Sequence, residues 1–201
     1  VGDCLYEDIS GPDGSPDGVI DAYDQTVLGS GLPKVNFGLS THLEYKGFDL
    51  NISTYGVLNY HVSDDIYNSL NSCYGYGNKE VGMLDANRWS EDGSTYLSSV
   101  PRTYAANNAT LAWNDLFSSR KIQNAAYWKI ANVELGYNFP DKWFGGYVNG
   151  VRLYVSAQNL YTFTGYHGYN VDYAGGTFTP GYNFCSFPSA RTFMCGLHFT
   201  F

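Results

Sequence analysis

Long runs in which apolar and polar residues alternate constrain this chain more than any other feature of its sequence. In residues 35–45, apolar side chains alternate with polar ones such as Ser40 and Glu44. Lys46-Gly47 follows, a pair typical of a tight two-residue hairpin turn, and the alternation resumes over residues 48–60. Because successive side chains of a strand point to opposite faces, the pattern predicts two antiparallel strands, each with one apolar and one polar face.

Three further runs repeat the pattern, over residues 127–139, 151 to about 163, and 192–201. Strands of globular proteins typically have about 5–6 residues, so runs of this length are unusual. They suit tilted strands that cross a bilayer. The sequence therefore predicts an all-β fold with about five long antiparallel strands.

The connections between these runs are unequal. Those at residues 46–47 and about 140–150 are short, whereas those at about 61–123 and 165–190 are long. Since short and long connections alternate, all the long loops fall at one end of the sheet, as in outer-membrane barrels. Five strands cannot close a barrel, for which about eight is the smallest number. We therefore expect this chain to be part of a larger barrel.

Composition excludes several other classes of protein. The formal net charge is −8, with no basic patch to neutralise phosphates, which argues against nucleic-acid binding. Aromatic residues make up 17% of the chain, too many for a disordered acidic tail. The chain contains no run of 18 apolar residues, so its sequence does not predict a membrane-spanning helix. The mean hydropathy of −0.27 does not separate a soluble protein from a barrel, because alternating faces average out.

An acidic segment over residues 13–24 has the spacing of a 12-residue calcium loop. Oxygen ligands fall at positions 1, 3, 5, 9 and 12, Val19 supplies the position-7 carbonyl, and Gly18 stands at the turn position. Pro16 at position 4 and an Asp in place of Glu at position 12 depart from the pattern, so a simple Asp–Gly turn without an ion stays an alternative. The proposed calcium ligands are Asp13, Ser15, Asp17, Val19, Asp21 and Asp24.

The long connections are rich in Tyr and Trp, beside Asn and Asp. Aromatic faces next to polar side chains suit sugar rings, but they equally suit packing within loops or contact with a lid protein. From this set we expect Arg88 with Trp89, and Tyr166 with Tyr169, to contact a substrate or a lid. On the polar faces of the strands, we expect a charge network of Glu44, Asp49, Glu134 and Arg152.

Catalytic motifs are absent from the sequence. It contains no GxSxG, HExxH, P-loop or GxGxxG pattern. Its four His residues lack the spacing of a zinc site. We therefore expect a protein that is not an enzyme.

An ordered series of motifs runs along nearly the whole chain. The motifs are Asp17-Gly18-Val19-Ile20-Asp21 with Asp24, Leu28-Gly29, Pro33-Lys34 with Phe37-Gly38, Tyr45-Lys46-Gly47-Phe48-Asp49-Leu50, Arg88-Trp89-Ser90, Val100-Pro101-Arg102, Ser118-Ser119-Arg120, Asn132-Val133 with Leu135-Gly136-Tyr137 and Phe139-Pro140, Arg152 with Tyr154-Val155-Ser156 and Gln158-Asn159-Leu160-Tyr161-Thr162, Pro188 with Arg191-Thr192-Phe193, Gly196-Leu197 and Phe201. In this order, the series resembles the C-terminal end of a SusC/RagA-like TonB-dependent outer-membrane transporter. The order of the motifs is more specific than any one of them.

The resemblance implies that residues 1–201 are the C-terminal segment of a 22-stranded transmembrane barrel of the bacterial outer membrane, with its plug and N-terminal strands absent from this sequence. It implies active import of glycans, oligosaccharides or peptides, energised through TonB, with a SusD-like surface lipoprotein as partner. A rival hypothesis is a secreted, calcium-stabilised β-sandwich that binds carbohydrate. That hypothesis explains the aromatic residues and the acidic segment, but not the length of the strands or the loops gathered at one end.

Overall fold

The structure, a computed structural model, describes residues 2–72, 77–82, 89, 101–102, 114, 116–143, 150–172 and 175–200. The chain divides into two compact units, one of residues 1–29 and 63–122 and the other of residues 30–62 and 123–201. Each unit is described by itself below.

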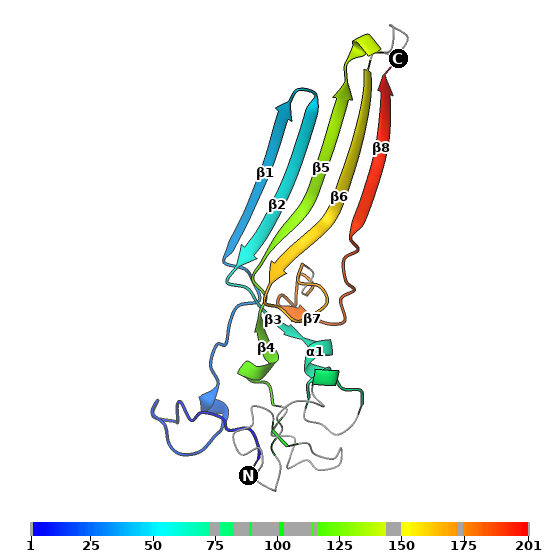
Figure 1. Cartoon of the computed structure of the whole chain (residues 1–201). Coiled ribbons are helices and arrows are strands. Elements are labelled where there is room, and N and C mark those ends of the chain that lie inside the picture. Colours follow the sequence, from blue (N-terminus) through cyan, green and yellow to red (C-terminus); the bar gives the residue numbers. More distant parts are fainter. Residues whose placement is uncertain are drawn as a thin grey trace. The chain divides into compact units, whose positions relative to one another are not determined.

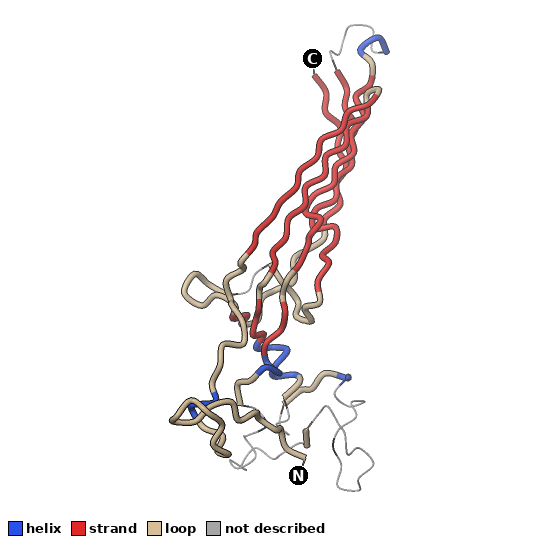
Figure 2. The backbone as a smooth tube through the Cα atoms, turned by 90° about the vertical axis from the view of Figure 1, so that its left-hand side faces the viewer, coloured by secondary structure: helices blue, strands red, loops and turns tan. Residues whose placement is uncertain are grey.

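A five-stranded antiparallel sheet dominates the second unit (Figure 1). Its strands lie in the order β1-β2-β5-β6-β8. We call the end of the sheet at the β1–β2 hairpin the turn end, and the opposite end the loop end. The tube in Figure 2 shows the five strands twisting together along their length. Their bounds are Val35–Tyr45, Phe48–Leu58, Tyr127–Phe139, Gly150–Thr164 and Thr192–Thr200.

The register of the sheet gives each face its composition. Leu43 pairs with Leu50, which pairs with Leu135 on the next strand, so apolar side chains form continuous rows across the sheet. The register shifts once between Ser53 and Thr54 on β2, opposite Ala131 on β5. Such a β-bulge inserts an extra residue and changes which residues of the strand share a face. Beyond the bulge, Lys129 therefore joins the polar face.

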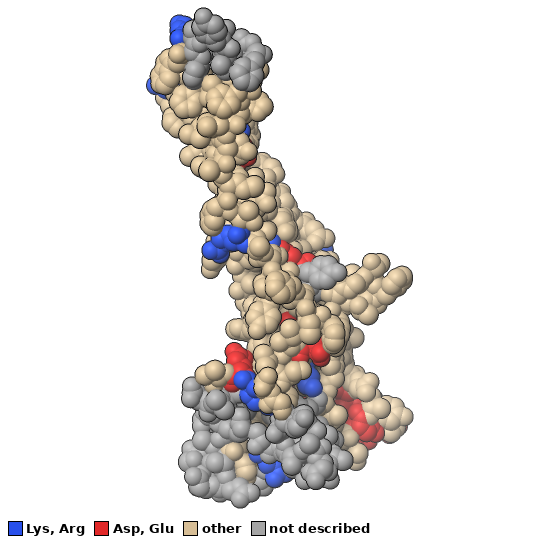
Figure 3. All heavy atoms as spheres, turned by 90° about the vertical axis from the view of Figure 1, so that its right-hand side faces the viewer, with Lys and Arg blue, Asp and Glu red and all other residues tan. Residues whose placement is uncertain are grey.

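The apolar face of the sheet is exposed. Leu39 is 64% exposed and Leu197 57%, in the middle of their strands. An exposed apolar area of this kind marks a surface that meets a partner or a membrane. Figure 3 shows few Lys, Arg, Asp or Glu side chains along the strands on the side it presents.

Two clusters of aromatic rings lie on this apolar face, one at each end of the sheet. At the loop end, Trp128 stacks on Phe163 with 5.3 Å between ring centroids, and Tyr161 contacts Phe163 at 4.7 Å. At the turn end, Phe48 and Tyr137 are 4.5 Å apart, and Tyr137 and Phe139 are 4.9 Å apart. Transmembrane barrels place aromatic girdles in the same way, at the two edges of their apolar band.

Short elements complete the described structure. A three-stranded sheet has the order β4-β3-β7, and the α-helix α1 begins at Asp65. The bounds are His61–Asp64 for β3, Asp65–Leu70 for α1, Ile122–Asn124 for β4, Tyr182–Asn183 for β7, and Ala22–Asp24, Ser119–Lys121 and Asp141–Trp143 for the 3-10 helices η1, η3 and η4.

The small core of the second unit lies at the loop end of the large sheet. Val62 and Ala125 are fully buried, and Tyr60, Tyr127, Tyr166 and Val171 pack around them. Tyr60 stands just after β2, which ends at Leu58 because Asn59 adopts a left-handed backbone with φ 53°. The predicted strand over 48–60 is therefore two residues too long.

The first unit has polar contacts of its own. Arg102 donates two hydrogen bonds to the carboxylate of Asp3, both 2.8 Å long, and the Cys4 N–H donates to Asn114 Oδ1 at 2.6 Å. The Asp64 carboxylate accepts from the Tyr67 N–H at 2.8 Å and caps α1. The contacts of Asp3 and Cys4 join segments about 100 residues apart in the sequence, whereas the Asp64 cap is local.

Among the described residues, no helix is both long enough and apolar enough to span a membrane.

Candidate functional site

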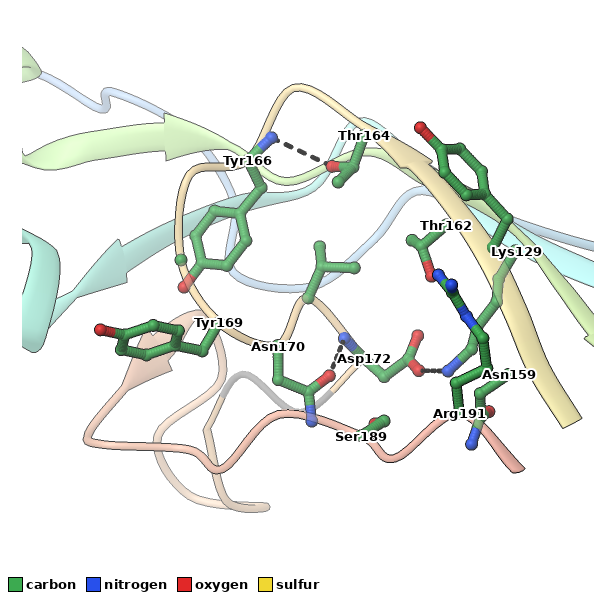
Figure 4. A pocket seen from close by; sticks show the side chains of 13 residues that line it. Lys129, Asn159, Thr162, Thr164, Tyr166, Tyr169, Asn170, Asp172, Ser189 and Arg191 are labelled. Carbon is green, nitrogen blue, oxygen red and sulfur yellow. Dashed lines mark hydrogen bonds and ion pairs between the residues drawn. The ribbon is translucent and has the colours of Figure 1, made fainter. Parts of the chain in front are cut away.

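A polar pocket opens at the loop end of the five-stranded sheet, within the second unit (Figure 4). Its volume is about 320 Å³. The residues that line it are Lys129 of β5, Asn159, Tyr161, Thr162 and Thr164 of β6, Tyr166 and residues 168–172 of the loop that follows, and Ser189 and Arg191. Ligand sites of proteins commonly have volumes from about 300 to 1,000 Å³.

Hydrogen bonds from the strands hold the two loop segments in place. Asn159, in the left-handed backbone region with φ 52°, donates from Nδ2 to the Ala190 carbonyl at 2.9 Å. Tyr166 is only 7% exposed, and its hydroxyl accepts a 2.8 Å bond from Asn183 Nδ2. The walls of the pocket are thus anchored to β6 and to the small core.

A buried ion pair forms the floor of the pocket. The Lys129 ammonium binds the Asp172 carboxylate, and the two side chains are 4% and 19% exposed. The Tyr55 hydroxyl donates to the same carboxylate at 3.4 Å. A buried charge is tolerated where it is paired and hydrogen-bonded, so these two charges neutralise one another.

Arg191 adds a second cation to the lining. Its side chain is exposed, and no hydrogen bond or ion pair joins it to another residue within the described part of the chain. In Figure 4 the Arg191 side chain extends into the pocket beside Thr162 and Lys129. The guanidinium is therefore available to a ligand.

The predicted contact residues are only partly brought together. Tyr166 and Tyr169 both line the pocket, Tyr166 buried and Tyr169 62% exposed. Trp89 belongs to the other unit, where its ring packs against Gly2, and it does not line this pocket. Arg88 lies outside the described residues. Whether any of these residues contacts a substrate or lid stays a prediction.

Lys129, Asp172 and Arg191 were missed by the sequence analysis. Lys129 and Asp172 are 43 residues apart, and the bulge at Ala131 hides the face to which Lys129 belongs. The available signal was Lys129 itself, which stands among apolar residues near the start of a predicted strand. Because Lys is seldom fully buried unless it is paired, a lysine at such a position indicates an acidic partner.

The carboxylates of the acidic segment bind backbone N–H groups of their own loop. Asp24 accepts from Ile9, Ser10 and Asp21 at 2.8, 3.2 and 2.8 Å. Asp17 accepts from the Val19 N–H, and Asp21 from the Tyr23 N–H. Asp8, outside the predicted calcium ligands, accepts from the Gly18 N–H at 2.6 Å.

These bonds lower the pKa of Asp24 below its ordinary value, because N–H groups, that of Asp21 foremost, stabilise the carboxylate. Within the described residues, no three His, Cys, Asp or Glu side chains form a group that could hold a metal. The loop as described is thus built on Asx-type turns. Calcium binding through Asp13, Ser15, Asp17, Val19, Asp21 and Asp24 stays a prediction.

The polar face of the sheet carries a charge network near the turn end. Arg152 donates to the Asp49 carboxylate at 2.5 and 3.1 Å and to Glu134 at 2.7 Å. Asp49 is 5% exposed and also accepts from Asn138 Nδ2 at 3.2 Å. The predicted network is confirmed for these three charged residues.

The fourth predicted member, Glu44, bonds elsewhere on the same face. Its carboxylate lies 2.9 Å from Nε2 of His42, whose Nδ1 lies 2.6 Å from Asn51 Oδ1.

Comparisons with known proteins agree on one group of relatives, although no protein-family model matches the chain. The chain is 30% identical over 205 residues to the TonB-dependent receptor P3 of Formosa agariphila, covering 98% of this chain and 19% of that protein. It is 26% identical over 191 residues to the TonB-dependent receptor SusC of Bacteroides thetaiotaomicron, covering 94% of this chain and 17% of SusC.

Solved structures agree on the fold. The RagAB peptide transporter matches with a TM-score of 0.75 at 22% identity, over 98% of this chain and 20% of the chain compared. The chain thus spans about a fifth of the length of its relatives, whose names are those of receptors and a transporter rather than enzymes. The all-β, barrel-type fold is confirmed, as an open sheet within this chain. Over nearly its whole length, the chain resembles the SusC/RagA-like TonB-dependent receptors, as its sequence motifs predicted.

Proposed function

We propose that this chain forms part of the barrel wall of an outer-membrane importer that takes up glycans, oligosaccharides or peptides. The observation that supports this most is the contrast between the two faces of the five-stranded sheet. One face exposes apolar side chains between two aromatic clusters, and the other holds the Arg152 network and the Lys129–Asp172 pair. Lipid outside and a polar lumen inside account for both faces.

The separation of the aromatic clusters suits a bilayer. Trp128 and Tyr137 are nine residues apart on β5, or about 30 Å at roughly 3.3 Å per residue. At a tilt of roughly 40°, this length covers about 23 Å of membrane, near the apolar band of about 25 Å in outer-membrane barrels.

The complete importer would work with partners that lie outside this chain. We propose a SusD-like lipoprotein on the loop side and the TonB complex acting through the N-terminal region. The similarity to SusC and to the RagAB transporter supports these partners. We propose no reaction for the chain, since its relatives are named as receptors and a transporter.

Uptake by the native bacterium tests the proposal. Deleting the gene that encodes this chain should abolish growth on one glycan or peptide source, and the complete gene should restore it. Deleting TonB should abolish the same growth. The protein should fractionate with the outer membrane and require detergent for extraction.

Two results would contradict the proposal. Uptake that persists without TonB would exclude a TonB-dependent importer. A water-soluble protein that binds sugar with calcium would favour the secreted β-sandwich instead.

A further inference from the structure

We propose that the polar pocket at the loop end is a subsite for a carboxylate group of the transported ligand, with Arg191 as the residue that binds it. This inference rests on the proposed function and names the chemistry that one of its sites selects.

The charge of the pocket departs from that of the chain. The formal net charge of the whole chain is −8, yet the lining contains Lys129 and Arg191 against one acidic residue, Asp172. The ion pair between Lys129 and Asp172 cancels two of these charges. Among the described lining residues, the positive charge of Arg191 is the one left for a ligand.

The side chains around Arg191 suit a carboxylate. A guanidinium presents parallel N–H donors that match the two oxygens of a carboxylate. The hydroxyls of Thr162 and Ser189 line the same cavity and can donate to an oxygen or accept from a neighbouring hydroxyl. A single uncompensated cation balances a monoanion, and so favours a carboxylate over a phosphate dianion.

The size of the pocket and one aromatic ring define the rest of the ligand. A cavity of about 320 Å³ is near the lower limit for small-molecule sites, so it suits one residue or one sugar of an oligomer. The exposed ring of Tyr169 offers a flat apolar face to the body of that unit. An acidic peptide and a uronic acid glycan both supply the required carboxylate.

Binding to the complete, detergent-purified transporter tests the inference. The probes are two matched pairs: a capped triglutamate peptide with a capped triglutamine peptide, and a trimer of galacturonic acid with a trimer of galactose. Calorimetry should show that one carboxylate probe binds at least about tenfold more tightly than its neutral partner. The pair that discriminates identifies the peptide or the glycan as the source of the carboxylate.

Variants assign the preference to the pocket. Arg191→Gln should remove the preference for the charged probe. Arg191→Lys should keep part of this preference, because a lysine retains the positive charge but lacks the parallel N–H donors of the guanidinium. Lys142→Gln is the matched control, since it removes an exposed cation in η4 that does not line the pocket. It should leave the discrimination unchanged. Heat-modified mobility on a gel checks that each variant is still a folded barrel.

Three results would overturn the inference: equal affinity for charged and neutral probes, no binding of either charged probe, or discrimination that survives Arg191→Gln in a folded barrel. Each leaves the proposed function intact if TonB-dependent growth persists. Loss of TonB-dependent uptake from the native protein, in contrast, would overturn the function itself.

Discussion

The two faces of the five-stranded sheet belong to the same strands, yet they differ in which side chains are exposed and which are buried. On one face, the large apolar side chains of Leu39 and Leu197 are exposed. On the other, Asp49 and Lys129 are almost fully buried and each pairs with an opposite charge. In a water-soluble protein the burial would be reversed. The exposure of a face therefore does not by itself show whether that face meets water or lipid. The pairing of buried charged groups on the opposite face does.

The network on the polar face should give the largest effect. Arg152→Met should destabilise the barrel by about 3–5 kcal/mol, because it leaves the buried Asp49 carboxylate without its cation. Urea unfolding in detergent measures the change. The double variant with Asp49→Asn should recover much of the loss, since no buried charge is then unpaired. A single variant as stable as the native protein would show that the pair is not buried.

A charge placed on each face separates them more directly. Leu39→Arg puts a cation on the apolar face and should cost about 2–4 kcal/mol if the position lies near the bilayer centre. Ser40→Arg is the matched control on the polar face, one residue along β1, and it should cost far less. Folding into lipid vesicles at increasing urea concentration measures both. Equal costs would contradict the assignment of lipid to one face only.

Glycines on the polar face sharpen the comparison at a smaller scale. A Cβ at Gly136 would collide with the carboxylate of Asp49 and the guanidinium of Arg152, so Gly136→Ala should cost about 1–3 kcal/mol. At Gly38, the nearest atom to a Cβ is the Thr54 carbonyl oxygen at 3.7 Å, an ordinary contact. Gly38→Ala should therefore be nearly neutral in the same unfolding experiment. A neutral Gly136→Ala would mean that the network tolerates displacement.

The acidic segment provides the smallest expected effect, since its carboxylates pair with their own backbone rather than with a face of the sheet. The pKa of Asp24 is lowered in the folded loop, so its stabilisation is present above the unfolded value of about 3.9 and is lost as the pH falls through the lower folded value. The protection factors of the Ile9, Ser10 and Asp21 amides against hydrogen exchange should fall over that range. Asp24→Asn should abolish this pH dependence, whereas Asp13→Asn should preserve it.

Calcium is tested on the same amides. If the predicted ligands from Asp13 to Asp24 bind the ion, calcium should slow exchange at Asp21 in the native protein and leave the Asp24→Asn variant unchanged. An identical exchange rate with and without calcium would show that the segment is an Asp–Gly turn without an ion.

The five long strands could be predicted because alternation is a local signal that a half-exposed sheet preserves. The strands at 35–45 and 127–139 begin and end as predicted, and β6 differs from its prediction by one residue at each end. The short elements could not. β3, α1, β4 and β7 have two to six residues each and depend on contacts between distant segments, such as the Ala125 N–H with the Tyr60 carbonyl.

The pocket itself was not predicted, although two of its lining residues were among the predicted contacts of a substrate or lid. Tyr166 and Tyr169 stood out as aromatic residues in a polar loop. The charged residues could not be predicted, because the Lys129–Asp172 pair depends on a β-bulge and on the path of a loop. A local sequence pattern predicts neither of these.

Spin-label accessibility along β1 of the complete transporter in lipid vesicles tests the central claim most directly. Nitroxides placed singly at residues 37–43 are probed with oxygen, which concentrates in lipid, and with a nickel chelate, which stays in water. The two faces predict a period of two residues, with odd positions such as Leu39 accessible to oxygen and even positions such as Ser40 to nickel. Uniform accessibility to nickel on both faces would contradict a membrane-spanning wall.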